Sequence, residues 1–213
     1  MNGSKATALA EWAQKTGHGL TRFDYSGHGQ SDGKFIDGTI GQWIKDALYI
    51  LDNHTVGKKI LVGSSMGGWI TLHLALLRPE RVAGLVGIAS APDFTEELIW
   101  NVISEGAREK LLKDGVFYEP PKYDTEPTPF TKQLIEDGRK HLLLARETLP
   151  VACPVRLIHG MNDVDVPWEF SRRISEKVES DNVQIHLIKD GDHRLSRPQD
   201  IDWIFKSIED IIR

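Results

Sequence analysis

The 213-residue sequence predicts one α/β domain, in which a mostly parallel sheet is covered by helices on both faces. Two observations lead to this class. Short apolar segments bounded by glycine alternate with segments of helical periodicity, which is typical of parallel strands joined by crossover helices. In addition, 40 % of the residues are hydrophobic, which is enough for a buried core in a chain whose length usually corresponds to one domain.

The individual elements follow from the spacing of the apolar residues. Helices are expected where such residues recur three and four positions apart, at 4–16, 40–53, 66–77, 167–179 and 199–212. Strands are expected at the short apolar runs 19–25, 59–63, 82–89, 155–159 and 183–188. Residues 26–38 are rich in Gly, Ser and Asp, so a loop is expected there.

The alternation of strands and helices is interrupted between residues 93 and 150. Two helical stretches are predicted there, near 94–113 and 129–147, around loops that contain proline and tyrosine. We interpret 93–150 as a helical cap, with a purely structural excursion as the alternative. Its apolar residues could line an apolar pocket or form the core of the cap itself: Phe94, Leu98, Ile99, Trp100, Val116, Phe117, Tyr118, Tyr123 and Phe130.

Composition argues against several classes of protein. Lys and Arg total 26 against 31 Asp and Glu, and the net charge of -5 argues against a nucleic-acid partner. Cys153 is the only cysteine, so no intrachain disulfide is possible. No apolar run approaches the ~18 residues of a membrane span. We find no phosphate-binding glycine loop and no closely spaced metal-ligand pair, so no cofactor is expected.

The strongest motif is Gly63-x-Ser65-x-Gly67, which lies between a predicted strand and a predicted helix. A serine on so sharp a turn has a strained backbone, and its hydroxyl stands clear of the sheet. We expect Gly63 and Gly67 to let strand and helix pass closely. Ser65 is then the candidate nucleophile, and the backbone N–H of Met66 is the candidate oxyanion donor. A glycine-rich turn that only caps the helix is the alternative.

A serine hydroxyl needs a base, and in this type of site an acid and then a histidine follow the serine along the chain. Of eight histidines, His193 is the candidate base because it lies in the loop after the last predicted strand. Asp163 is the candidate acid because it follows the strand 155–159 by four residues. Asp93 and Asp165 remain alternatives, and Asp165 could instead cap the helix near Pro167.

Four motifs, in order and spacing, resemble one particular family. They are Asp24-Tyr25-Ser26-Gly27-x-Gly29-x-Ser31-Asp32-Gly33, Gly63-Ser64-Ser65-Met66-Gly67-Gly68-Trp69, His159-Gly160-Met161-x-Asp163-x-x-Val166-Pro167-Trp168 and Asp192-His193-Arg194. The chain resembles the α/β-hydrolase family of the mitochondrial palmitoyl-protein thioesterase and acyl-glucuronide esterase, together with its bacterial relatives. The resemblance implies ester or thioester hydrolysis through an acyl-serine intermediate, without a cofactor, with Ser65, Asp163 and His193 as the triad.

The sequence departs from this family at its N-terminus. In the family, strands precede the helix that corresponds to 4–16, and the loop before that helix supplies a second oxyanion donor. Because this chain begins at Met1 with the helix, we expect a central strand and half of the oxyanion hole to be absent, and a truncated start is our hypothesis. The resulting alternative is an inactive, hydrolase-like binding module; a C–C bond hydrolase would share the same triad. The expected location is cytoplasmic, or mitochondrial for a eukaryotic chain whose N-terminus is missing.

Overall fold

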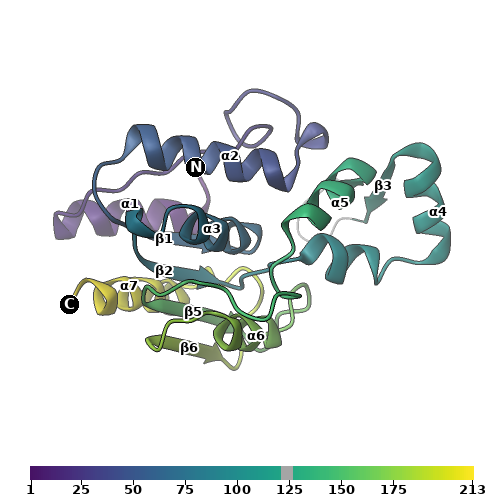
Figure 1. The fold of residues 1–213 in the computed structure, drawn as a ribbon. Helices are drawn as coiled ribbons and strands as arrows, with labels where there is room; N and C mark the ends of the chain where they lie inside the picture. Colours follow the sequence, from purple (N-terminus) through teal and green to yellow (C-terminus); the bar gives the residue numbers. More distant parts are fainter. Residues whose placement is uncertain (121–126) are drawn as a thin grey trace.

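The computed structural model describes residues 1–120 and 127–213. Within these residues, four parallel strands form the main sheet in the order β1-β2-β5-β6 (Figure 1). The strands are β1 (Lys59–Ser64), β2 (Val82–Ile88), β5 (Val155–Gly160) and β6 (Val183–Ile188). The helices around it are α1 (Ser4–Thr16), α2 (Ile40–His54), α3 (Met66–Leu77), α6 (Glu169–Lys177) and α7 (Pro198–Ile212). The predicted fold class is confirmed.

Two hydrophobic clusters hold these layers together, one on each face of the sheet. The first combines residues of α2, α3 and α6, such as Trp43, Ile70 and Ile174, and the second combines residues of α1 and α7, such as Leu9 and Ile204. Neighbouring residues of one strand point to opposite faces, so in β5 Leu157 belongs to the first cluster and Ile158 to the second. The sheet is therefore buried on both sides, as its uninterrupted apolar strands predict.

The strand predicted at 19–25 does not form. In the described part of the chain these residues belong to no sheet. Their polar groups bond to the following loop instead: the hydroxyl of Ser31 donates to the carbonyl of Asp24 at 2.7 Å, and the N–H of His28 donates to that of Tyr25 at 2.9 Å. Phe23 and Tyr25 nevertheless pack against the first core cluster. The prediction failed because a strand needs a partner in register, and an apolar run does not specify one.

The segment between β2 and β5 contains strands as well as helices. Its elements are a π-helical turn η3 (Thr95–Trp100), α4 (Glu105–Asp114), the antiparallel pair β3 (Val116–Glu119) and β4 (Thr128–Thr131), α5 (Lys132–Gly138) and a 3-10 turn η4 (Arg139–His141). The helix predicted at 129–147 is thus wrong at both ends. The strand β3 forms because Gly115, with φ of 78°, ends α4, and the β-forming residues Val116, Phe117 and Tyr118 follow it.

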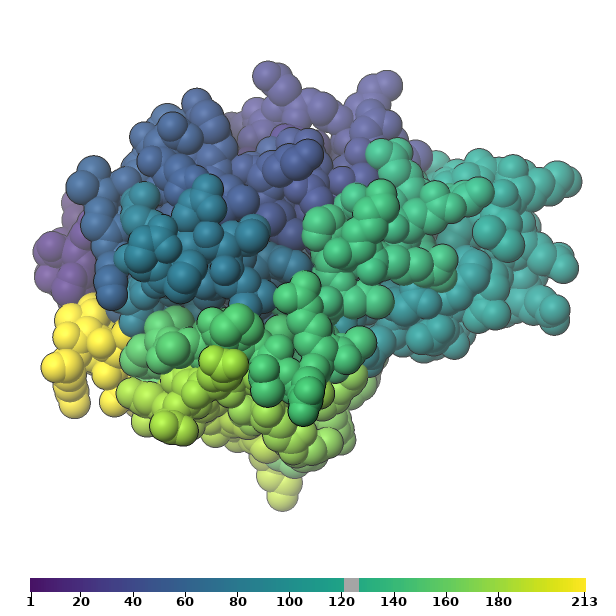
Figure 2. Space-filling model, in the orientation of Figure 1, coloured from purple at the N-terminus to yellow at the C-terminus, as the bar shows by residue number. Residues whose placement is uncertain are grey.

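This segment projects from one end of the sheet (Figure 1) and forms a separate lobe on the surface (Figure 2). It has a small core of its own, in which Ile99, Leu111 and Ile135 are buried. Five of the nine apolar residues singled out in the sequence belong to this core, namely Ile99, Phe94, Trp100, Phe117 and Phe130, whereas Leu98 packs against the first core cluster. Tyr118 is exposed, and Tyr123 lies outside the described residues. These side chains therefore stabilise the lobe, and its role as a lid stays a prediction.

Candidate active site

Ser65 occupies the turn between β1 and α3. Its backbone has φ of 54° and ψ of -119°, a conformation that L-residues rarely adopt. The surrounding backbone holds it there, because its N–H donates to the carbonyl of Ile88 at 2.9 Å and its carbonyl accepts from Ala91 at 3.1 Å. Met66 is the first residue of α3, so its N–H is among the helix N–H groups that have no intrahelical partner.

The glycines of this turn differ in what they make possible. A Cβ at Gly63 would lie 2.3 Å from the carbonyl oxygen of Gly67, so strand and helix do pass closely at Gly63. The same expectation for Gly67 is wrong, since a Cβ there would meet nothing within 4 Å. The second close approach is at Gly68, where a Cβ would lie 2.2 Å from Oγ of Ser90. Gly68 is one residue further along α3, so a side chain there would point towards Ser90, whereas a side chain at Gly67 would point into open space.

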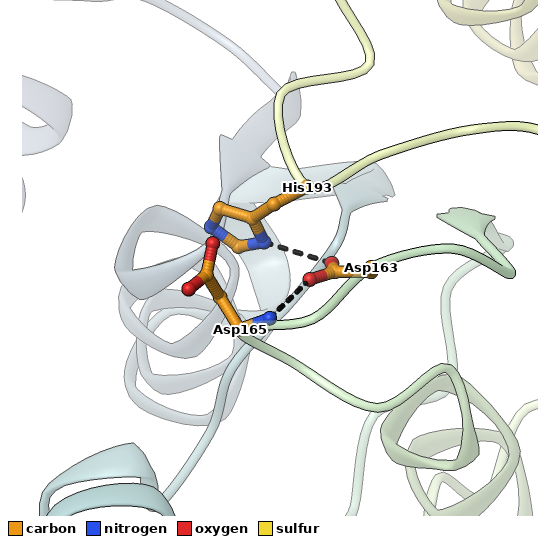
Figure 3. Close-up of side chains that lie close together, drawn as sticks. All are labelled: Asp163, Asp165 and His193. Atoms are coloured by element: carbon orange, nitrogen blue, oxygen red, sulfur yellow. Dashed lines mark hydrogen bonds and ion pairs between the residues drawn. The ribbon is translucent and has the colours of Figure 1, made fainter. Parts of the chain in front are cut away.

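His193 links the serine to an acid. Its Nε2 lies 3.1 Å from Oγ of Ser65, and its Nδ1 lies 2.8 Å from Oδ2 of Asp163 (Figure 3 shows the second contact). The three residues come from three separate segments: the β1–α3 turn, the loop after β5 and the loop after β6. The structure therefore brings together all three side chains singled out in the sequence.

The carboxylate of Asp163 is fully buried and saturated with hydrogen-bond donors. Its Oδ1 accepts the N–H groups of Asp165 at 2.9 Å and Val166 at 2.8 Å, while Oδ2 faces His193 and, at 3.3 Å, Nε2 of His159. Burial by itself raises the pKa of this carboxyl group. The hydrogen bonds from His159, His193 and Val166 outweigh burial and hold the pKa of Asp163 well below its usual range. Asp163 is therefore an anion at neutral and at mildly acidic pH.

His159 supports Asp163 and was not among the candidate site residues drawn from the sequence. It is fully buried, and its Nε2 faces two acceptors, the carbonyl of Val166 at 2.9 Å and the carboxylate of Asp163. Nε2 must therefore carry the proton, and Nδ1 accepts from the hydroxyl of Ser171 at 2.8 Å. This arrangement fixes both the ring and the carboxylate. The spacing of four residues between His159 and Asp163, beginning on a buried strand, was the signal available in the sequence.

The two alternative acids have other surroundings. The carboxylate of Asp93 accepts the N–H groups of Leu143 at 2.8 Å and Leu144 at 2.7 Å, so it joins the two ends of the projecting segment. Asp165 does not cap α6, whose N-cap is Trp168 without a side-chain bond. Its carboxylate turns towards the imidazole of His193 (Figure 3), and Asp163, Asp165 and His193 offer ligand atoms within 4.8 Å of one another. In this group, Nδ1 of His193 is already hydrogen-bonded to Asp163.

The tryptophan that follows the glycine pair connects the site to the projecting segment. The carbonyl of His141 accepts from Nε1 of Trp69 at 3.1 Å and from Nε2 of His73 at 2.9 Å. Both donors lie on α3, the helix that begins beside Ser65. Burial lowers the pKa of His73 to about 4, so this imidazole is neutral at pH 7.

Among the described residues, no helix is long and apolar enough to cross a membrane.

Known proteins resemble this chain over its full length. Residues 3–115 match the family model described as the alpha/beta hydrolase fold. The mitochondrial palmitoyl-protein thioesterases ABHD10 of Rattus norvegicus and Homo sapiens are 43 % and 41 % identical; in each case the match covers 100 % of this chain, and it covers 71 % and 69 % of those proteins.

Solved structures agree with this assignment. A structure from Agrobacterium vitis S4 has a TM-score of 0.96 and 45 % identity, and mouse alpha/beta hydrolase domain-containing protein 10 has a TM-score of 0.89 and 39 % identity. Each match covers 100 % of this chain and 84 % of the other. The chain therefore belongs to the α/β-hydrolase family and is a hydrolytic enzyme of the esterase type.

Proposed function

We propose that the protein is a serine hydrolase that cleaves carboxylic esters or thioesters through an acyl-serine intermediate. The observation that carries this proposal is the continuous chain of hydrogen bonds from Oγ of Ser65 through His193 to the buried carboxylate of Asp163. In it, Ser65 is the nucleophile, His193 the general base and Asp163 the acid that orients the imidazole.

The reaction has two halves that use the same groups. Oγ of Ser65 attacks the carbonyl carbon while Nε2 of His193 takes the hydroxyl proton, and the N–H of Met66 donates to the oxyanion that develops. The imidazolium, stabilised by anionic Asp163, then protonates the departing alcohol or thiol, which leaves an acyl-serine. Water attacks this ester with His193 again as base, and the carboxylic acid is released as Ser65 recovers its proton.

The substrate class is inferred from the relatives. Those from rat and human are named palmitoyl-protein thioesterases, and this favours fatty-acyl thioesters. Acyl glucuronides, which the resemblance of the motifs implies, are a further candidate group of esters. The same names describe mitochondrial proteins, which favours a mitochondrial over a cytoplasmic location if the source is eukaryotic. No nucleic acid and no cofactor enters the proposed reaction.

A fluorophosphonate probe tests the proposed nucleophile, because it phosphonylates only a serine that an assembled base activates. We expect labelling of the wild-type chain and none of Ser65→Ala, with Ser64→Ala as the matched control that labels normally. Retained labelling in Ser65→Ala would contradict the assignment. Absence of labelling in the wild type would favour the non-catalytic, binding-module alternative.

The acyl preference is tested separately with substrates. We expect hydrolysis of p-nitrophenyl butyrate and of a palmitoyl thioester, and no cleavage of a vinylogous 1,5-diketone, the substrate type of C–C hydrolases. Hydrolysis of short esters alone would remove the fatty-acyl proposal and leave the esterase in place. Cleavage of the diketone in preference to both esters would overturn the ester assignment.

A further inference from the structure

The loop that carries His193 is anchored in the protein on both sides of the histidine. On one side, Gly191 lies so close to Gly160 that a Cβ on Gly160 would be 2.3 Å from the carbonyl oxygen of Gly191. On the other side, Leu195 has φ of 43°, is fully buried in the second core cluster, and donates its N–H to the side chain of Asp192 at 2.9 Å. Between these anchors, the backbone at 193–194 sets where the imidazole points.

The backbone of this short stretch accepts hydrogen bonds at the carbonyl of Arg194, one of them from the hydroxyl of the nearby Ser196 at 3.0 Å and the other from a side chain distant in sequence. The ammonium group of Lys5, in the first turn of α1, donates to the carbonyl of Arg194, the residue directly after His193. The two positions are 189 residues apart in sequence. Leu9, one turn further along α1, belongs to the same core cluster as Leu195. The start of α1 and the histidine loop are therefore joined by a polar contact and take part in the same core cluster.

Lys5 is not in the position of an ordinary surface lysine. It is half-buried, and burial lowers the pKa of its ammonium group. The charges that face it are the carboxylates of Asp192 and Asp200, which favour the ammonium form, and the guanidinium of Arg194, which disfavours it. A lysine that served only to solvate α1 would keep its ammonium in water, as the exposed Lys15 in the last turn does.

We propose that Lys5 is a positioning residue for the general base: by holding the carbonyl of Arg194, its ammonium group keeps Nε2 of His193 within hydrogen-bond distance of Ser65. This inference rests on the proposed function, since it assigns His193 that role. A misplacement of about 1 Å in a catalytic group can reduce the rate about 100-fold. Loss of this contact is therefore expected to slow the chemistry at Ser65 without removing substrate-binding groups.

The experiment compares the rate and the extent of fluorophosphonate labelling in four variants of the full chain. Lys5→Met removes the donor and keeps the length of the side chain, and Lys5→Arg restores a cationic donor. Lys15→Met is the matched control on the same helix. Ala13→Gly weakens α1 at a buried position, at a cost of about 1 kcal/mol, without touching the contact. Thermal unfolding of every variant, and kcat and KM for p-nitrophenyl butyrate, complete the set.

We expect Lys5→Met to label to the same final extent as the wild type, at a rate about 10- to 100-fold lower, with kcat reduced and KM nearly unchanged. Lys5→Arg should recover most of the rate, and the two control variants should label at the wild-type rate. A wild-type rate in Lys5→Met would refute the inference. An equal slowing in Ala13→Gly, or a lower final extent with an unchanged rate, would show a general loosening of α1 and refute it too.

These outcomes are distinct from failure of the proposed function. If the wild-type chain does not label at Ser65, the serine-hydrolase assignment fails and the role of Lys5 fails with it. If the wild type labels and Lys5→Met labels equally fast, only the inference about Lys5 fails.

Discussion

Acidification should destabilise this protein through His73 as the pH falls from 6.5 towards 4. The pKa of His73 is about 4 in the folded chain against an ordinary value of 6.5, mainly because of burial. The unfolded chain therefore binds more protons than the folded chain between these two values, and stability falls as pH falls through that window. Above pH 6.5 the contribution of neutral His73 is fully present.

The size of the effect follows from the same two values. One pKa unit corresponds to about 1.4 kcal/mol, so the full loss is about 3 kcal/mol, reached below pH 4. At pH 5 the linkage relation gives a loss of about 2 kcal/mol. His73→Gln is the appropriate reference, because its amide N–H₂ lies about where Nε2 lies and can still donate to the carbonyl of His141, yet it does not titrate.

The assay is urea unfolding of the wild type and of His73→Gln from pH 7.5 down to pH 4.5, with the difference in unfolding free energy plotted against pH. This difference cancels titrating groups that lie away from His73, such as His186, whose pKa burial also lowers. We expect the wild type to lose about 2 kcal/mol relative to His73→Gln by pH 5. A difference that stays constant with pH would refute the assignment of His73 as a buried neutral group.

Three further predictions concern the site and its supports. Gly63→Ala should destabilise the fold by about 1–3 kcal/mol or more, because its Cβ meets the carbonyl oxygen of Gly67. Gly67→Ala is the comparison, since a Cβ there has open space, and in a thermal scan it should unfold within a few degrees of the wild type. Asp163→Asn should lower kcat for p-nitrophenyl butyrate by a factor of up to about 10⁴, since an amide that donates to Nδ1 favours the wrong tautomer of His193; a loss below tenfold would contradict the role of Asp163. Asp93→Ala should leave the N–H groups of Leu143 and Leu144 without an acceptor, which destabilises the fold by about 1–3 kcal/mol for each group. Limited proteolysis near residues 139–146 should then be faster than in the wild type. Unchanged cleavage would show that other contacts hold this segment.

The sequence predicted the parts of the fold that depend on local patterns. The helix 4–16 and the strand 183–188 were assigned with the bounds found in the structure, because each has a clear period and clear ends. The group formed by Ser65, Asp163 and His193 was predictable for another reason: each residue follows a strand whose carboxyl end reaches the same edge of the sheet.

The remainder required knowledge of contacts between distant segments. Residues 19–25 have the composition of a strand, but composition does not supply a pairing partner. The pair β3 and β4 was hidden because each strand has only four residues, which is too short for a two-residue period to stand out against a helical one. Lys5 could not be assigned, because its role depends on an Arg194 carbonyl that only the folded chain brings near.

The carboxylate of Asp93 holds the two ends of the projecting segment together, which bears on how freely the length of this segment can change. Because Asp93 accepts the N–H groups of Leu143 and Leu144, the residues between 93 and 143 form an excursion whose two ends are held together. Closing such an excursion costs little more when it lengthens, only about 0.6 kcal/mol for each doubling. The segment can therefore be lengthened, shortened or exchanged as a graft while Ser65, Asp163 and His193 keep their places. The lid role predicted for this segment would then allow substrate preference to diverge while the site residues stay in place.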